Sequence, residues 1–137
     1  STNRRFLETT RSLVGQYNAF CPRAGVCVNG YGSLGENIGD LSGLQIAYEA
    51  YRATLDGAEA PVIDGLTGDQ RFFLSFARTF RAKLRGEMMD MQIRSDHPPN
   101  NYRVNGAVRN MDAWYDAFDI KPGDRLYLAP EDRVHVW

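Results

Sequence analysis

The pattern of apolar and polar positions predicts helices over most of the chain. Apolar residues recur every three or four positions over 4–20, 34–55 and 68–84, the spacing of one helix face. Shorter helices are predicted over 87–95 and 111–118. The glycine- and proline-containing segments between them are predicted to be long loops. The pattern therefore indicates a mainly α fold with little β structure.

Local signals mark where three of these helices begin or end. Thr67 and Gln70, three residues apart, have the form of a capping box that opens the third helix. Gly57 is expected to end the second helix, and Asn110 is a fair N-cap for the last one. The phenylalanines on one face of the third helix are expected to lie mostly in the core, while its far end, Thr79-Phe80, could line a cleft.

The second predicted helix carries two kinds of unfavourable residue. Glu36 and Asp40 share one face, where like charges four residues apart repel by a few tenths of a kcal/mol. Gly35, Gly39 and Gly43 each cost roughly 1 kcal/mol relative to alanine in a helix interior. We expect a compensating gain: a neighbour packed close against the glycines, and a cation or donor group held by the acids.

Composition narrows the class of protein. The 137 residues are one domain's worth, and 43% hydrophobic with 24% charged residues is ordinary for a globular protein. The net charge of −1 provides no electrostatic reason to expect nucleic acid or an anionic membrane as a partner. Every apolar run is far shorter than the roughly 20 residues that span a bilayer.

The two cysteines lie six residues apart in a loop rich in turn residues. Cys21 and Cys27 could form a small disulfide, which would imply an oxidising compartment, or could be two free thiols. The sequence leaves these alternatives open. A zinc knuckle made only of cysteines is not expected, because there is no second pair.

Few residues could carry acid–base or nucleophilic chemistry. His97 lies in a proline-flanked loop beside Asp96 and six residues before Arg103. A histidine next to a carboxylate can donate to a developing oxyanion, and an arginine can bind a carbonyl or carboxylate. The alternative is an exposed loop histidine and a structural arginine. His135, within Val-His-Val, is expected to face solvent without a role.

Glu36 and Asp40 by themselves suit three interpretations. They could be a metal ligand with a supporting acid, partners for arginines, or an ordinary polar face. The sequence has no His-x-x-x-His or Glu-x-x-His pair, so this chain alone is not expected to complete a three-ligand zinc site.

Several short motifs follow one another in a fixed order along the chain. They are Val28-Asn29-Gly30 with Leu34-Gly35-Glu36-Asn37-Ile38-Gly39-Asp40, then Phe72-Phe73-Leu74-Ser75-Phe76-Ala77, then Ser95-Asp96-His97 with Tyr102-Arg103-Val104-Asn105-Gly106, and finally Ala117-Phe118, Gly123-Asp124, Tyr127 and Pro130-Glu131-Asp132-Arg133-Val134-His135-Val136-Trp137. In order and spacing, over nearly the whole chain, they resemble the C-terminal part of the neprilysin-like zinc metallopeptidases, the M13 family.

The resemblance implies roles for individual residues. Glu36 would be the third ligand of one zinc ion, and Asp40 would orient a zinc-bound histidine. His97 would stabilise the oxyanion of the tetrahedral intermediate, and Arg103 would bind a backbone carbonyl of the substrate. Thr79 and Phe80 would line the pocket for a large apolar side chain after the scissile bond.

This chain departs from the family pattern in several places. The family's His-Glu-x-x-His helix, which supplies two zinc ligands and the glutamate base, is absent and by the family layout lies upstream of Ser1. The large N-terminal helical domain is absent too. Asp96 and His97 are adjacent, where the family usually has one residue between them, and Gly39 stands where alanine is usual.

We therefore expect residues 1–137 to be the C-terminal part of a thermolysin-like zincin catalytic domain. The whole protein would be a zinc endopeptidase acting on oligopeptides, extracellular or periplasmic, secreted or anchored to a membrane through a segment outside this chain. Its partners would be peptide substrates and the rest of the same peptidase, with no nucleic acid. The isolated fragment would be inactive and could self-associate. The alternative is a non-catalytic α-helical binding module whose acids pair with arginines.

Overall fold

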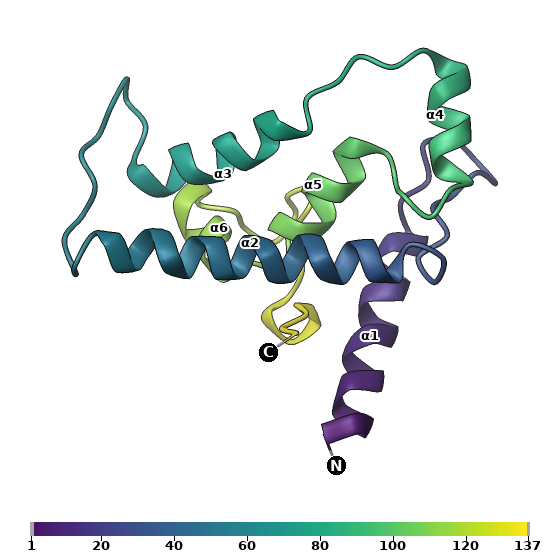
Figure 1. Ribbon diagram of the computed structural model, residues 1–137, viewed down its shortest axis with the longest axis horizontal. Coiled ribbons are helices and arrows are strands. Elements are labelled where there is room, and N and C mark those ends of the chain that lie inside the picture. The colour runs from purple at the N-terminus through teal and green to yellow at the C-terminus, as the bar shows by residue number, and fades with distance from the viewer. Residues whose placement is uncertain (1, 137) are drawn as a thin grey trace.

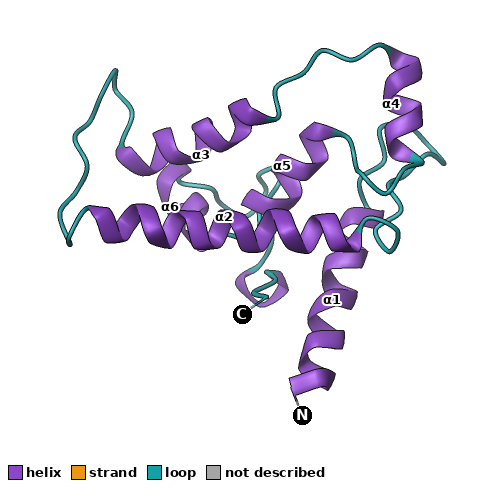
Figure 2. Cartoon of the chain, in the orientation of Figure 1, coloured by secondary structure: helices purple, strands orange, loops and turns teal. Residues whose placement is uncertain are grey.

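The computed structural model describes residues 2–136 as helices joined by loops, with no β-strand among them (Figures 1 and 2). This confirms the mainly α prediction. The elements are α1 (Thr2–Asn18), α2 (Leu34–Thr54), α3 (Gly68–Thr79), α4 (Gly86–Ile93), α5 (Asn100–Val108), α6 (Asp112–Phe118) and a 3-10 turn, η1 (Pro130–Asp132). Trp137, the last residue of the closing motif, lies outside the described residues, as does Ser1.

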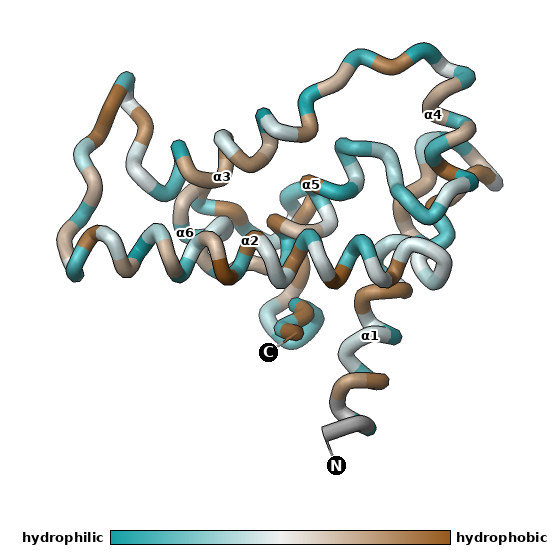
Figure 3. The backbone as a smooth tube through the Cα atoms, in the orientation of Figure 1, coloured by the Kyte–Doolittle hydropathy of each residue, from teal (hydrophilic) through white to brown (hydrophobic). Residues whose placement is uncertain are grey.

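The longest helix, α2, organises the arrangement of the others. It packs mainly against α5, whereas α3 packs mainly against α6 (Figure 1). The C-terminal end of α1 lies near the N-terminal end of α2. The N-terminal end of α1 points away from the rest of the molecule. Along α2, apolar residues recur at intervals among polar ones (Figure 3), and Asn37, Leu41 and Leu44 are buried at the three- to four-residue spacing of one helix face.

The core lies where α1, α2, α3 and α5 meet. It includes Leu13 and Tyr17 of α1, which are almost fully buried. The apolar residues at the start of α1 lie outside the core, since Phe6 and Leu7 are 43% and 47% exposed. That part of α1 extends beyond the elements that could cover it (Figure 1). The other core residues are Val28, Leu41, Leu44, Phe73, Ala107, Val108, Met111 and Val134.

Helix α3 begins as predicted but ends early. Its capping box is formed, with the Gln70 amide donating to Thr67 Oγ1 at 3.2 Å and the Thr67 amide donating to Gln70 Oε1 at 3.0 Å. The prediction that the helix continues to Leu84 is wrong, since it ends at Thr79. The side-chain amide of Asn100 donates to the Phe80 carbonyl at 2.9 Å, and this tertiary contact satisfies a carbonyl at the end of the helix.

Helix α5 was not predicted from the sequence. The prediction of a loop through Arg103 is wrong, because a helix begins at Asn100, directly after Pro99. Proline is incompatible with a helix interior but not with the position just before the first turn. The Pro99 carbonyl accepts from the amides of Tyr102 and Arg103 at 2.8 and 3.1 Å. Arg103 is therefore held on a helix and not on a loop.

Asn110 is not the N-cap that was predicted, because α6 begins at Asp112 with Met111 as its N-cap. The buried side chain of Asn110 instead connects three parts of the chain. Asn110 Oδ1 accepts from the Val134 amide at 2.7 Å and from Gln16 at 3.0 Å, while its Nδ2 donates to Gln16 and to the Gly106 carbonyl. These bonds attach the C-terminal tail to α1 and α5. His135, the next residue after Val134, is exposed as predicted.

The cysteine alternatives are decided in favour of a disulfide. Cys21 and Cys27 are bonded, with their Cα atoms 4.0 Å apart. The bond closes the loop that connects α1 to the segment before α2.

We expect Gly106→Ala to lower the free energy of unfolding by about 1–3 kcal/mol. A Cβ at Gly106 would overlap with Cζ and the hydroxyl oxygen of the buried Tyr17, so α5 would have to move away from α1. The matched control is Gly39→Ala on α2, where a Cβ has no described neighbour within 4 Å and alanine should favour the helix. Urea unfolding measures both; equal effects in the two variants would contradict this account.

Candidate functional site

An ion-paired cluster forms where α2 meets α5. Glu36 and Asp40 of α2 both contact Arg103 of α5. Arg103 Nε donates to Asp40 Oδ2 at 2.6 Å and Arg103 Nη2 donates to Asp40 Oδ1 at 2.7 Å, a bidentate pair. The same Nη2 donates to Glu36 Oε2 at 3.1 Å. The two like charges on α2 thus share one cation, which offsets their repulsion.

Burial differs between the members of this cluster. The side chains of Asp40 and Arg103 are 10% and 19% exposed, whereas that of Glu36 is 39% exposed. Hydrogen bonding to Asp40 raises the pKa of Arg103, so the guanidinium keeps its charge. The Asp40–Arg103 pair is therefore the fixed base of the cluster, and the Glu36 carboxylate is the part open to a ligand.

His97 completes the cluster from the loop before α5. Its Nε2 lies 3.3 Å from Glu36 Oε1, and its Nδ1 lies 3.1 Å from Asp96 Oδ1. Asp96 and His97 are in contact even though no residue separates them. The imidazole is 55% exposed, so one histidine edge faces solvent beside the open carboxylate of Glu36. The arrangement thus places the Glu36 carboxylate, a group that can bind a metal ion, next to the His97 imidazole and the Arg103 guanidinium.

The end of α3 brings the two remaining predicted residues close to this cluster. The Phe80 ring lies against Arg103, with 5.1 Å between its centroid and the guanidinium carbon. Thr79 instead lines a groove of about 360 Å³ between α2 and α3, together with Asp40. Other residues of that groove are Gly39, Gly43, Leu44, Ala47, Phe72, Ser75 and Phe76.

The glycine face of α2 has no neighbour in the described part of the chain. A Cβ added at Gly35, Gly39 or Gly43 would meet nothing within 4 Å among residues 2–136. The expectation of a close-packed partner is therefore not met by these residues. The face is open, and two of its glycines line the groove beside Asp40.

A zinc ion would find one suitable ligand here, not a complete site. Carboxylate oxygens bind zinc, and Glu36 offers one that is partly exposed. Among the described residues, no three or more histidine, cysteine, aspartate or glutamate side chains are grouped so that they could hold a metal. The donor set fits a contribution of one ligand, with further ligands required from elsewhere.

Tyr17 is a residue near this cluster that the sequence indicated only as part of an apolar stripe. Its side chain is fully buried, and its hydroxyl makes no hydrogen bond within the described residues. Burial, with a smaller contribution from the charge of Asp40, raises the pKa of Tyr17 well above its usual range. Its ring packs against Gly106 of α5. Only the tertiary contact identifies it.

The sequence of the chain matches a known protein family. The model of peptidase family M13 matches residues 1–134. Neprilysin-3 of Drosophila melanogaster is 34% identical over 138 residues, covering 97% of this chain and 17% of the relative. Human neprilysin is 34% identical over 138 residues, covering 96% of this chain and 18% of the relative. The chain thus spans less than a fifth of the length of these relatives.

Solved structures agree with the sequence matches. The zinc metalloprotease of Mycobacterium tuberculosis, solved in complex with an inhibitor, superposes with a TM-score of 0.93 at 44% sequence identity. The match covers 98% of this chain and 22% of that structure.

Proposed function

Because this chain belongs to peptidase family M13, we propose that it is the C-terminal part of the catalytic domain of a zinc-dependent endopeptidase that hydrolyses oligopeptides. Residues 1–137 would all belong to that domain. The observation that carries the proposal is the convergence of Glu36, Asp40, His97 and Arg103 from two helices and a loop. The non-catalytic binding module is not favoured by the family membership, although the pairing of the acids with an arginine suits it equally.

In this proposal Glu36 is the protein's third ligand to one zinc ion, and two further ligands come from outside this chain. When bound, zinc polarises the scissile carbonyl and lowers the pKa of a water molecule. The exposure of Glu36 supports this role, since its side chain is more exposed than those of Asp40 and Arg103.

Asp40 would orient a zinc-bound histidine by accepting its other ring N–H. Each oxygen of Asp40 accepts one hydrogen bond from Arg103. A carboxylate oxygen has two lone pairs, so each still has one free for an imidazole. The bidentate pair with Arg103 fixes the carboxylate plane and therefore the direction of that remaining acceptor.

Arg103 would bind a backbone carbonyl of the substrate through the nitrogen that the cluster does not use. Its Nε and Nη2 are bonded to the acids, while Nη1 has no acceptor among the described residues. A guanidinium carries five N–H donors in a rigid fork, so the two on Nη1 remain available in a fixed direction.

His97 would donate from Nε2 to the oxyanion of the tetrahedral intermediate. Asp96 contacts Nδ1 and so holds the ring in place, and Nε2 lies beside the proposed zinc ligand Glu36. A donor placed where charge develops stabilises the transition state more than the substrate. Thr79 and Phe80, at the end of α3, would shape the neighbouring subsite for a large apolar side chain.

We propose an extracellular or periplasmic location for the whole protein. The Cys21–Cys27 disulfide supports it, because such bonds persist mainly in oxidising compartments. Within residues 2–136, no helix has the length and apolarity needed to cross a membrane. Secretion or membrane anchoring through a segment outside this chain stays a prediction.

We expect the full-length protein to cleave fluorogenic oligopeptides in a chelator-sensitive way, and residues 1–137 alone to bind zinc weakly and cleave nothing. Zinc needs three protein ligands at a catalytic site, and this chain offers one. Inductively coupled plasma mass spectrometry and a peptidase assay on both proteins test this. Robust, chelator-sensitive cleavage by the 137-residue chain would overturn the division of ligands, and a full-length protein without peptidase activity would overturn the proposed function.

A further inference from the structure

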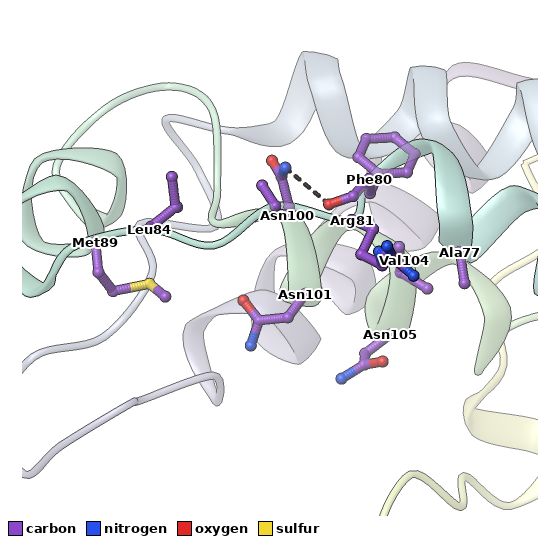
Figure 4. Close-up of a pocket in the computed structure, with 10 residues that line it drawn as sticks. Ala77, Phe80, Arg81, Leu84, Met89, Asn100, Asn101, Val104 and Asn105 are labelled. Atoms are coloured by element: carbon purple, nitrogen blue, oxygen red, sulfur yellow. Dashed lines mark hydrogen bonds between the residues drawn. The ribbon is translucent and has the colours of Figure 1, made fainter.

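A second pocket, lined in part by Phe80, is separate from the groove lined by Thr79. It holds about 340 Å³ between the end of α3, the extended segment 81–85, α4 and α5. Leu84 and Met89 lie at one end and Phe80 with Val104 at the other (Figure 4). This volume, with apolar side chains among the lining residues, is in the range of small-molecule binding sites.

Two of the polar side chains that line this pocket are amides without hydrogen-bond partners among the described residues. Asn101 and Asn105 of α5 line it, and neither side chain makes a hydrogen bond to another described residue. Asn100 also lines it but uses its Nδ2 to hold the Phe80 carbonyl at 2.9 Å (Figure 4). The amides of Asn101 and Asn105 are thus free to bind a polar ligand such as a peptide group.

The segment 78–85, on one side of the pocket, carries four basic residues, whereas α4 on the other side carries Glu87 and Asp90. Arg78, Arg81, Lys83 and Arg85 fall within eight residues, and no acidic residue occurs over 70–86. All four are exposed, and none of them forms an ion pair within the described part of the chain. Of these four, only Arg81 lines the pocket.

We propose that this pocket is a subsite for a peptide segment that carries a carboxylate next to an apolar side chain. Arg81 would pair with the carboxylate, Asn101 and Asn105 would bind the peptide backbone, and Leu84, Met89 and Val104 would contact the apolar group. The proposal rests on the proposed peptidase function, for which the pocket would hold a part of the substrate beyond the groove of Thr79.

The position of Phe80 connects the pocket to the proposed catalytic cluster. Its ring contacts Arg103, and the same residue lines the pocket. Helix α5 likewise carries Arg103 on one face and Asn101 and Asn105 on another. A peptide lying across the end of α3 could therefore reach both sites, with the carboxylate in the pocket.

The test measures binding of short capped peptides to the full-length protein by isothermal titration calorimetry. Acetyl-Leu-Glu-amide carries a side-chain carboxylate, acetyl-Leu-Gln with a free C-terminus carries a terminal one, and acetyl-Leu-Gln-amide carries none. We expect one or both acidic peptides to bind about tenfold more tightly than the neutral one, because a charge-assisted pair is gained. The better of the two identifies the source of the carboxylate. Mass spectrometry afterwards checks that the peptides are intact.

Two charge reversals locate the effect. Arg81→Glu should abolish the preference for the acidic peptide, and the milder Arg81→Gln should reduce it. The matched control is Lys83→Glu, which makes the same charge change two residues away at a side chain that does not line the pocket. It should change the preference by no more than about twofold, because an exposed charge is well screened at physiological salt.

Three results would overturn the subsite: no preference in the unaltered protein, a preference that survives Arg81→Glu, or an equal loss in Lys83→Glu, which would indicate a diffuse field and not a pocket. These readouts do not need hydrolysis. A protein that shows the Arg81-dependent preference but cleaves no peptide would contradict the proposed peptidase and leave the pocket as an acidic-peptide site.

Discussion

Glu36→Ala in the full-length protein is expected to abolish zinc retention and to lower peptide hydrolysis by more than about a thousandfold, because the metal supplies several kcal/mol of transition-state stabilisation. The fold should survive the change. Arg103 keeps its bidentate pair with Asp40, and Glu36 is the partly exposed member of the cluster. Metal content after gel filtration and kcat/KM for a fluorogenic peptide measure the two effects.

Glu49→Ala is the matched control for this variant. Glu49 is an exposed acid on the same helix and makes no ion pair with a described residue. It should keep both zinc and activity. If Glu36→Ala retained zinc at the level of Glu49→Ala, the assignment of Glu36 as a ligand would be wrong, whatever the activity of the variant.

His97→Ala is expected to lower kcat by about a hundred- to a thousandfold while zinc content and KM change little. The histidine is exposed, and the polar contacts of its side chain within the described residues are with Asp96 and Glu36. Removing it should therefore cost a transition-state donor and not a ligand or a core contact. Steady-state kinetics with metal analysis of the same preparation separate these effects.

His135→Ala is the control, since the chain's other histidine is exposed and close to none of the proposed site residues in sequence. Its kinetics should match those of the unaltered protein. A loss of zinc in His97→Ala as large as in Glu36→Ala would refute the separate roles of the two residues. A rise in KM with unchanged kcat would assign His97 to substrate binding.

Helices with strong local signals were predictable from the sequence alone. The capping box at Thr67 and Gln70 and the breaker Gly57 act through neighbours in the chain, and the structure confirms both. Gly57 has a φ of +79°, a conformation that glycine adopts without strain. The errors occur where a distant contact decides. The end of α3 depends on Asn100, twenty residues after Phe80, and the place of Asn110 depends on Gln16 and Val134.

The candidate site divides in the same way. The spacing of Glu36 and Asp40 on one helix face follows from the helical period, so the sequence indicated that they would act together. The sequence left three roles open for them: metal binding, pairing with arginines, or an ordinary polar face. Arg103 is their partner because it lies on α5, a helix that follows Pro98-Pro99 and that the sequence pattern did not predict. This helix places the Arg103 side chain against Asp40 of α2.

The sequence by itself determined the mainly α class and the position of Glu36 and Asp40 on one helix face, because these depend on residues within a few turns of one another. It also carried the family motifs, in their order along the whole chain. The tertiary structure decided three things: the pairing of both acids with Arg103, the disulfide between Cys21 and Cys27, and the open glycine face of α2. These depend on how separate elements pack. The free energy of that packing comes from contacts between distant residues, which local periodicity does not encode.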